Sequence, residues 1–276
     1  MARFVVVPQW QGSGSSRAMR LIDGAQTILG DLPSASTVSI DVPLEAGDER
    51  GSGVHRLGSL EIVRDRVRDA LRGVTDVVVT IGGDCGVELA AIEHARELHP
   101  DLAVVWFDAH GDLETPESST SHAFTGMVLR TLLGEGADEL LPPHPLDPAR
   151  VVLAGARDLS PAEEEFVADA GIALVDPLAL ADPADLVAAV LATGADAVYV
   201  HLDVDVLDPG EFAGKTDPVP FGISPAELVA AIRAVRGALP LVGAGISEFA
   251  PASPEAAVDD MGTILRVVGA LTAPLP

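Results

Sequence analysis

Short apolar runs recur along the chain and alternate with stretches of helical periodicity. Eight of these runs, each four to six residues long, are rich in β-branched side chains and contain little polar alternation. Runs of this kind are typical of strands that are buried on both faces. The expected strands are Phe4–Val7, Thr37–Val42, Val77–Ile81, Leu102–Phe107, Arg150–Leu153, Ile172–Val175, Ala197–Leu202 and Leu241–Ile246.

The stretches between these runs carry helical signals. Apolar residues recur at every third or fourth position from 57 to 71, and a similar spacing occurs from 187 to 191. Ser160-Pro161 and Ser224-Pro225 each place a capping hydroxyl before a proline, which favours the start of a helix. Strands that alternate with helices predict a mostly parallel sheet with helices on both sides, in a single α/β domain over residues 1–276.

The composition excludes several classes of protein. Of the 276 residues, 48% are hydrophobic, which is enough for a large buried core and excludes intrinsic disorder. The chain carries 42 acidic and 17 basic side chains, so its formal charge is −25. Because nucleic acids and anionic membranes attract basic surfaces, we expect neither as a partner.

The chain contains one cysteine, Cys85, and therefore cannot form an intrachain disulfide. A reducing compartment is the expected location. The apolar run Phe4–Val7 is too short for the core of a signal peptide or for a membrane span. We expect a cytoplasmic protein.

Acidic residues follow four of the expected strands directly. The carboxyl ends of parallel strands meet at one edge of a sheet, where ligands bind, so we expect these acids to converge. The segments that follow the strands are Gly82-Gly83-Asp84-Cys85, Asp108-Ala109-His110-Gly111-Asp112, Asp203-Val204-Asp205-Val206-Leu207-Asp208-Pro209 and Glu248.

Crowded ionised carboxylates repel one another, so a neutralising group is required. Alternate residues of an extended segment point the same way, which aligns Asp108, His110 and Asp112, and likewise Asp203 and Asp205. Mixed carboxylate and imidazole ligands suit Mn²⁺, Fe²⁺ or Zn²⁺ better than Ca²⁺. A pair of such ions bridged by carboxylates can activate water for hydrolysis at neutral pH.

A single aspartate after a strand is more often a turn or capping residue. We assign that structural role to Asp84 and Asp208, which lie in Gly-Gly-Asp and Leu-Asp-Pro contexts. The two longer acidic segments, 108–112 and 203–209, are not explained in this way, because both follow buried strands and both alternate possible ligands. Together they favour a metal centre.

These segments resemble the motifs of the arginase/agmatinase/formiminoglutamase (ureohydrolase) family, and the resemblance covers nearly the whole chain. It implies a three-layer α/β/α arginase-like fold with an eight-stranded, mostly parallel sheet and two Mn²⁺ ions. It also implies a homo-oligomer, although no interface motif is visible. By the resemblance, one ion would take Cys85, Asp108, Asp112 and Asp203, and the other Asp108, His110, Asp203 and Asp205.

The chain departs from the family pattern at Cys85, because the family usually has histidine after Gly-Gly-Asp. A thiolate can replace an imidazole as a ligand, although it adds negative charge and is open to oxidation. A similar replacement is associated with the arginase-like branch that hydrolyses Nω-hydroxy-L-arginine. The alternative is that Cys85 is a small buried apolar residue and that one metal is lost.

A second departure concerns proton transfer. Arginases carry a histidine just before the glycine that is Gly126 here, and it is thought to relay a proton to the leaving amine; Thr125 stands at this position. His122 could substitute in a rearranged loop, but a solvent-facing histidine is the favoured interpretation. An N-hydroxylated guanidine is less basic, so its hydrolysis depends less on such a relay.

A third departure concerns the tail of the substrate. Glu114 stands where arginases have an asparagine that holds the α-carboxylate, and Ser160 replaces an aspartate that helps to hold the α-amino group. A glutamate that faces a carboxylate repels it, which favours a decarboxylated or otherwise cationic guanidino compound unless Glu114 points away. The residues assigned to substrate binding are Glu114, Ser121, Thr125, Ser160 and Glu163.

The expected function is a manganese-dependent amidinohydrolase that hydrolyses the C–N bond of an arginine-like guanidino substrate, with Nω-hydroxy-L-arginine as a candidate, to an amine plus urea or hydroxyurea. Glu248 would hold the guanidinium, and Asp112 would carry the proton to the departing nitrogen. Lys215 and Asp217 could also reach the ligand, although surface charges are the favoured interpretation.

Other readings of the sequence remain. They are an agmatinase or formiminoglutamase-type activity and a catalytically silent arginase-fold binding protein. The run Gly243-Ala244-Gly245 after a strand suggests a nucleotide-binding enzyme, but the third glycine of that motif is missing.

Overall fold

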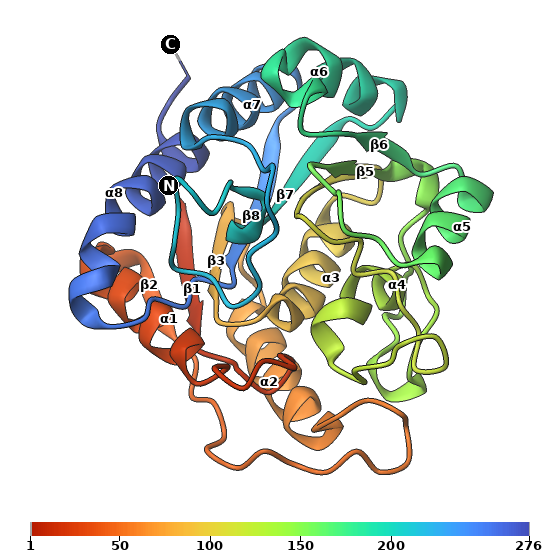
Figure 1. The fold of residues 1–276 in the computed structure, drawn as a ribbon, viewed down its shortest axis with the longest axis vertical. Coiled ribbons are helices and arrows are strands. Elements are labelled where there is room, and N and C mark those ends of the chain that lie inside the picture. The colour runs from red at the N-terminus through yellow and green to blue at the C-terminus, as the bar shows by residue number, and fades with distance from the viewer. Residues whose placement is uncertain (1, 276) are drawn as a thin grey trace.

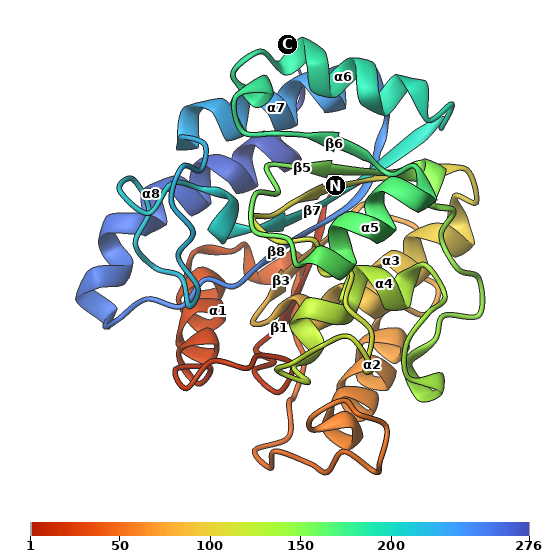
Figure 2. The same ribbon diagram turned by 45° about the vertical axis from the view of Figure 1, so that its right-hand side comes forward.

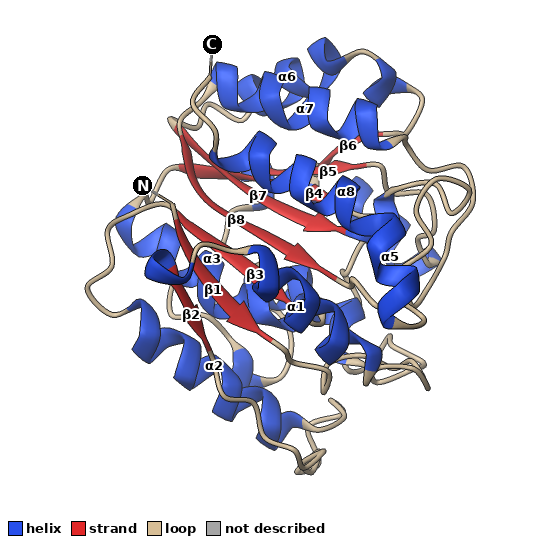
Figure 3. Cartoon of the chain, turned by 90° about the vertical axis from the view of Figure 1, so that its left-hand side faces the viewer, coloured by secondary structure: helices blue, strands red, loops and turns tan. Residues whose placement is uncertain are grey.

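The computed structural model describes residues 2–275. The strands in this range form one eight-stranded sheet in the order β2-β1-β3-β8-β7-β4-β5-β6, and each neighbouring pair is parallel. Figure 3 shows the arrows of the sheet running in one direction. The sheet confirms the predicted fold class. The strands are β1 (Arg3–Val7), β2 (Thr37–Ser39), β3 (Val78–Gly82), β4 (Leu102–Phe107), β5 (Val151–Ala154), β6 (Ala173–Val175), β7 (Ala197–Asp203) and β8 (Leu241–Ser247).

Helices cover both faces of the sheet (Figures 1 and 2). Helices α1, α6, α7 and α8 pack on one face, and α2, α3, α4 and α5 pack on the other. Their bounds are α1 (Arg20–Asp31), α2 (Leu57–Leu71), α3 (Glu88–Leu98), α4 (Val128–Leu132), α5 (Pro161–Ala170), α6 (Pro183–Ala192), α7 (Pro225–Ala238) and α8 (Pro254–Thr272). Within residues 2–275, no helix is both long and apolar enough to cross a membrane.

The two Ser-Pro pairs start helices as predicted. The Ser160 hydroxyl accepts a hydrogen bond from the backbone N–H of Glu163, and the Glu163 carboxylate accepts one from the N–H of Ser160. Ser224 and Glu227 form the same capping box at the start of α7. Because the boxes satisfy N–H groups that have no partner inside the helix, local sequence fixes where these helices begin.

The edge strands differ from the prediction. The sequence predicts strands buried on both faces at 37–42 and 172–175, whereas β2 and β6 have three residues each. Val38 is 39% exposed and Leu174 is 47% exposed. An edge strand has a neighbour on one side only, and the helices above and below it do not cover it fully. Strands β3, β4, β5 and β7, in contrast, are buried throughout.

The four strands that precede the acidic segments are consecutive in the sheet, in the order β3-β8-β7-β4. Figure 1 shows β8 between β3 and β7, although these strands are far apart in the chain. Since all four are parallel, their carboxyl ends lie at one edge of the sheet. The loops after them meet there, as the sequence predicts.

Candidate metal centre and substrate cavity

A cavity of about 500 Å³ opens where the loops after β3, β4, β7 and β8 meet. Two of the predicted site residues are not part of its wall: Asp108 is fully buried, and Ser160 caps α5. Among the described residues of the wall, seven are Asp or Glu and none is Lys or Arg. The wall is formed by Ser13, Gly14, Ser15, Cys85, His110, Asp112, Glu114, Ser121, Ala123, Thr125, Gly126, Glu163, Asp203, Asp205, Thr216, Asp217 and Glu248.

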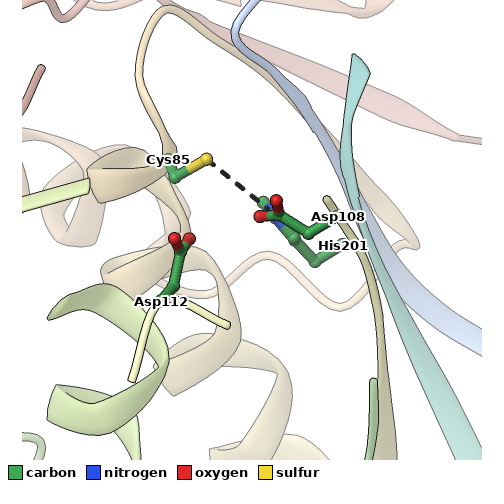
Figure 4. A group of neighbouring side chains, drawn as sticks. All are labelled: Cys85, Asp108, Asp112 and His201. Atoms are coloured by element: carbon green, nitrogen blue, oxygen red, sulfur yellow. Dashed lines mark hydrogen bonds and ion pairs between the residues drawn. The ribbon is translucent and has the colours of Figure 1, made fainter. Parts of the chain in front are cut away.

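Side chains that could hold cations form three groups, and within each group the ligand atoms lie within 4.8 Å of one another. Cys85 and Asp108 each belong to two groups, so the groups are joined into one centre. Figure 4 shows the side chains of the first group converging. Every predicted metal ligand belongs to at least one group. The groups are Cys85, Asp108, Asp112 and His201; Cys85, Asp203 and Glu248; and Asp108, His110 and Asp205.

The backbone of the acidic segments fixes the orientation of their carboxylates. Oδ1 of Asp108 accepts a hydrogen bond from the backbone N–H of His110 at 2.7 Å. Oδ1 of Asp203 accepts from the N–H of Asp205 at 2.8 Å, and Oδ1 of Asp205 accepts from the N–H of Ala109 at 2.9 Å. The bond between Ala109 and Asp205 joins the two acidic segments, so the carboxylates at the ends of β4 and β7 are held in fixed positions relative to each other.

Three carboxyls of the centre are not fully compensated by a positive charge. Burial raises the pKa of Asp112, Asp203 and Glu248 well above the ordinary range, and neighbouring carboxylates raise it further. Oδ2 of Asp112 and Oε1 of Glu248 are buried without a hydrogen-bond partner. Bound cations would neutralise this cluster and fill these open acceptor positions, so the donor set fits the metal ions that the sequence predicts.

His110 provides the positive charge that the cluster does have. Burial lowers the pKa of this imidazole, but hydrogen bonds and charge from Asp108 and Asp205 outweigh burial and raise it overall. Its Nδ1 lies 2.8 Å from Oδ2 of Asp205 and 3.4 Å from Oδ1 of Asp108. Without a metal, the protonated ring therefore takes the place of a cation between the two carboxylates.

Cys85 combines an apolar setting with polar neighbours. The residue is 2% exposed and belongs to the apolar cluster on the α3 side of the sheet. Burial raises the pKa of its thiol well above the ordinary range, and the nearby Asp203 raises it further. The thiol is therefore protonated in the metal-free protein, and its Sγ–H donates to Oδ2 of Asp203. A cation that displaces this proton would gain a thiolate ligand.

The two residues predicted to act in catalysis share an unusual backbone conformation. Asp112 has a φ of 53° and Glu248 a φ of 64°, so both are in the left-handed region that non-glycine residues rarely adopt. Strain of this kind often accompanies function. Oε2 of Glu248 accepts a hydrogen bond from Oγ1 of Thr216 at 3.0 Å, which leaves the second oxygen unpaired.

The residues assigned to substrate binding divide into two sets. Glu114, Ser121, Thr125 and Glu163 line the cavity, and the Glu114 carboxylate accepts a hydrogen bond from Oγ of Ser118. Glu163 also accepts from the backbone N–H of Leu113 at 3.0 Å. Ser160 contributes its hydroxyl to the capping box of α5 instead of to the cavity wall.

Asp84 and Asp208 have the structural roles predicted for them. The buried Asp84 carboxylate accepts hydrogen bonds from the backbone N–H groups of Gly12 and Gly86, both at 2.8 Å. Asp208 accepts from the N–H of Gly210 at 2.8 Å. Both carboxylates therefore hold loops around the cavity.

Lys215 and Asp217, on the loop after β7, have different surroundings. Lys215 is 6% exposed, so its interpretation as a surface charge is wrong. Burial lowers its pKa to about 8, and its Nζ donates to the carbonyl oxygen of Leu207, which anchors the loop. Asp217 is exposed at the cavity wall. His122 is half-buried, with Nδ1 2.9 Å from the carbonyl oxygen of Gly53, and it is not part of the wall.

Three residues near the centre have no counterpart among those predicted. Thr216 contacts Glu248, His201 belongs to a candidate metal group, and Glu88 lies beside His201. The sequence held a signal for two of them. His201 interrupts an apolar run two residues before Asp203, and Glu88 is an acid three residues after Cys85.

Comparisons with known proteins agree with this geometry. Residues 16–266 match the model described as the Arginase family. An Nω-hydroxy-L-arginine amidinohydrolase from Streptomyces lavendulae is 34% identical over 220 residues, which are 76% of this chain and 74% of that protein. An arginase from Staphylococcus aureus (strain COL) is 36% identical over 154 residues, which are 53% of this chain and 51% of that protein. The crystal structure of an arginase from Entamoeba histolytica in complex with L-ornithine has a TM-score of 0.87 at 23% identity, covering 99% of this chain and 98% of that one.

Proposed function

Because the chain belongs to the arginase family, and so is a hydrolase of C–N bonds in linear amidines, we propose that it is a manganese-dependent amidinohydrolase of an arginine-like guanidino substrate. Nω-hydroxy-L-arginine is the leading candidate, and the products are an amine plus urea or hydroxyurea. The observation that carries the proposal is the joined set of buried ligand groups at the ends of four consecutive strands.

Two Mn²⁺ ions suit the ligands of this centre. The first ion would be held by Cys85, Asp108, Asp112 and Asp203, and the second by Asp108, His110, Asp203 and Asp205. Carboxylate and imidazole donors are typical ligands of Mn²⁺, and the thiolate is the softer exception. When bound, the ions would supply Lewis acidity and make water nucleophilic at neutral pH.

Glu248 is suited to hold the guanidinium. Its Oε2 is fixed by Thr216, and its Oε1 is buried and unpaired at the cavity. A guanidinium N–H that donates to this oxygen forms a charge-assisted hydrogen bond, which is about twice as strong as a neutral one. The carboxylate would therefore orient the substrate carbon toward the metal centre.

Asp112 is suited to move the proton. Its Oδ2 is also buried and unpaired, which leaves an open acceptor position for a proton. It would collect the proton released by the attacking water and pass it to the departing nitrogen. Thr125 lines the cavity at the place of the family's histidine relay, and a less basic N-hydroxylated guanidine needs that relay less.

The charge of the cavity favours a cationic substrate. Seven carboxylates and no Lys or Arg line the described wall, so a guanidinium is attracted, and the hydroxyls of Ser15 and Ser121 are neutral donors for an α-carboxylate. Glu114 favours a second candidate function. Its carboxylate faces the same cavity and would repel an α-carboxylate, which supports an agmatinase-type activity on a decarboxylated substrate.

A screen of guanidino compounds with the manganese-loaded protein tests the proposal. Arginine, Nω-hydroxy-L-arginine, agmatine, guanidinobutyrate and formiminoglutamate would be supplied, and release of urea, hydroxyurea or formamide would be measured. We expect turnover of Nω-hydroxy-L-arginine that is lost on chelation and restored by Mn²⁺. Faster turnover of agmatine would favour the second candidate. Two bound metals without any turnover would favour a silent binding protein, and chelator-resistant turnover would reject the metal mechanism.

A further inference from the structure

A layer of polar side chains lies between α3 and the centre of the sheet. Glu88, Tyr199 and His201 are each at most 1% exposed, and none of them lines the cavity. Burying such groups is unfavourable unless they are paired. The Tyr199 hydroxyl donates to Oε2 of Glu88 at 2.7 Å, and Nδ1 of His201 lies 3.9 Å from the same oxygen.

The fold makes room for this layer. A Cβ added to Gly245 would lie 1.5 Å from Oε1 of Glu88, so only a glycine in β8 admits the carboxylate. The His201 ring is stacked on Trp106, with a centroid separation of 3.6 Å and an interplanar angle of 23°. The stacked indole fixes the plane of the imidazole, and Glu88 lies at ion-pair distance from its Nδ1, which has no hydrogen-bond partner.

The other ring nitrogen of His201 faces the metal centre. Its Nε2 lies 3.8 Å from Oδ2 of Asp108 and 3.9 Å from Sγ of Cys85, the contact drawn as a dashed line in Figure 4. Asp108 already accepts a hydrogen bond from Nε1 of Trp106 at 3.1 Å. The sulfur also lies 3.2 Å from Oδ2 of Asp203 and 3.2 Å from the hydroxyl oxygen of Ser247, so His201 is its ring-nitrogen neighbour.

We propose that His201, oriented by Glu88, is a positioning residue that donates an Nε2–H hydrogen bond to the Cys85 thiolate and so fixes it as a metal ligand. This inference rests on the proposed metal-dependent function. A thiolate that replaces a neutral imidazole adds one negative charge to a cluster rich in carboxylates, and an N–H donor aimed at the sulfur offsets part of that charge. The arrangement has the carboxylate–histidine pattern that orients ligands at metal sites, with the sulfur in place of the metal.

Cobalt substitution of the full-length protein tests the inference with a spectroscopic readout. A thiolate bound to Co²⁺ gives a sulfur-to-metal charge-transfer band, and Cys85→Ser should remove it. We expect His201→Leu to shift or abolish this band and to weaken Co²⁺ binding about 10-fold to 100-fold in calorimetry, the range typical of a lost outer partner. His201→Gln keeps an N–H near Nε2 and should retain most of the band and of the affinity.

Tyr199→Phe is the graded comparison, because it removes a hydroxyl from the same buried layer without touching Cys85. Since this hydroxyl bonds the oxygen of Glu88 that lies beside His201, the variant should change the band less than His201→Leu does. If His201→Leu fails to fold, Glu88→Gln carries the test, since weaker orientation of the ring should shift the band in the same direction; an unchanged band in Glu88→Gln would count against the inference.

Other results would overturn the inference. An unchanged band and affinity in His201→Leu would show that the ring does not position the sulfur. Equal loss of metal in His201→Gln and His201→Leu, with both folded, would show that the imidazole is itself a ligand. These results differ from failure of the proposed function, in which the wild-type protein would bind no Co²⁺ and show no band at all.

Discussion

The thiol sulfur of Cys85 lies 3.2 Å from Oδ2 of Asp203; Cys85 follows β3, and Asp203 is the last residue of β7. The thiol donates to a carboxylate that is itself a proposed metal ligand. A cation that binds between the two groups must therefore displace the thiol proton. The contact explains how buried Cys85 can be a neutral, protonated thiol in the metal-free protein and a thiolate ligand when a metal is bound.

Cys85→Ser should reduce the number of bound metal ions. A hydroxyl is a poor substitute for a thiolate, so we expect one of the two Mn²⁺ ions to bind at least about 10-fold more weakly. Metal analysis after gel filtration should give two ions per wild-type chain and one per variant chain. Cys85→His, which restores the usual family ligand, is the control and should keep two. Two tightly held ions in Cys85→Ser would instead support the interpretation of Cys85 as a buried apolar residue.

The metal-free protein should lose stability as the pH rises. Burial and neighbouring carboxylates raise the pKa of Asp112, Asp203 and Glu248 in the folded state. Between about pH 4, the value for unfolded chains, and those raised values, the folded chain binds more protons than the unfolded chain. The free energy of unfolding therefore falls with rising pH through this window.

Urea unfolding at about pH 5 and about pH 8, with chelator and with excess Mn²⁺, checks this dependence. The stabilisation by Mn²⁺ should be larger at the higher pH, because the carboxylates are then ready to bind it. A chelated protein that is more stable at the higher pH would contradict the assignment of raised pKa values.

Glu248→Gln should reduce kcat/KM by about 10²-fold, because it removes the charge that holds the guanidinium. The variant should still bind two metal ions, since Glu248 is not among the proposed ligands. Thr216→Val is the graded control: it frees Oε2 of Glu248 but keeps the charge, so a smaller loss is expected. Comparable activity of Glu248→Gln and the wild type would remove Glu248 from the proposed mechanism.

Glu114→Gln should change the choice of substrate. Removing a carboxylate from the cavity wall relieves repulsion of an α-carboxylate, so the ratio of kcat/KM for Nω-hydroxy-L-arginine to that for agmatine should rise about 10-fold, or roughly 1.4 kcal/mol. Glu117→Gln, an exposed acid on the same loop outside the wall, is the matched control. The same ratio of kcat/KM values in Glu114→Gln and Glu117→Gln would show that Glu114 does not discriminate between substrates with and without an α-carboxylate.

Ser160→Ala should act on stability and not on catalysis. Loss of the cap of α5 should destabilise the protein by about 1 kcal/mol, with KM nearly unchanged. Ser224→Ala removes the equivalent cap of α7 and should have a similar effect. If KM instead rises in Ser160→Ala but not in Ser224→Ala, Ser160 takes part in substrate binding, as the family resemblance implies.

Much of the fold could be predicted because the signals are local. The apolar runs mark the strands, and the Ser160 and Ser224 caps mark helix starts through bonds that span three residues. The strand predicted at 37–42 is longer than the observed β2, because a run of apolar residues does not tell how many neighbours a strand has in the sheet. Strand order, and so the exposure of Val38, depends on contacts far apart in the chain.

The candidate site could be predicted only where the ligands follow strands. Asp108 and Asp205 are such residues, and the parallel topology brings them together. Lys215 was misread because its burial depends on a loop that folds back to Leu207. His201 points to the centre from within a strand. Its partner Glu88 begins a helix 113 residues earlier in the chain, so no short sequence pattern could have predicted that the two residues meet.

The insertion of β8 between β3 and β7 has a consequence for how the protein is made. Until residues 241–247 leave the ribosome, the strands β2-β1-β3 and β7-β4-β5-β6 have no partner to join them, and the ligands they carry belong to two separate half-sheets. A chain terminated before β8 would therefore lack the strand that places Cys85, which follows β3, beside the acids at the ends of β7 and β4. The proposed two-metal centre would thus be assembled only after β8 has joined the two half-sheets, late in the synthesis of the chain.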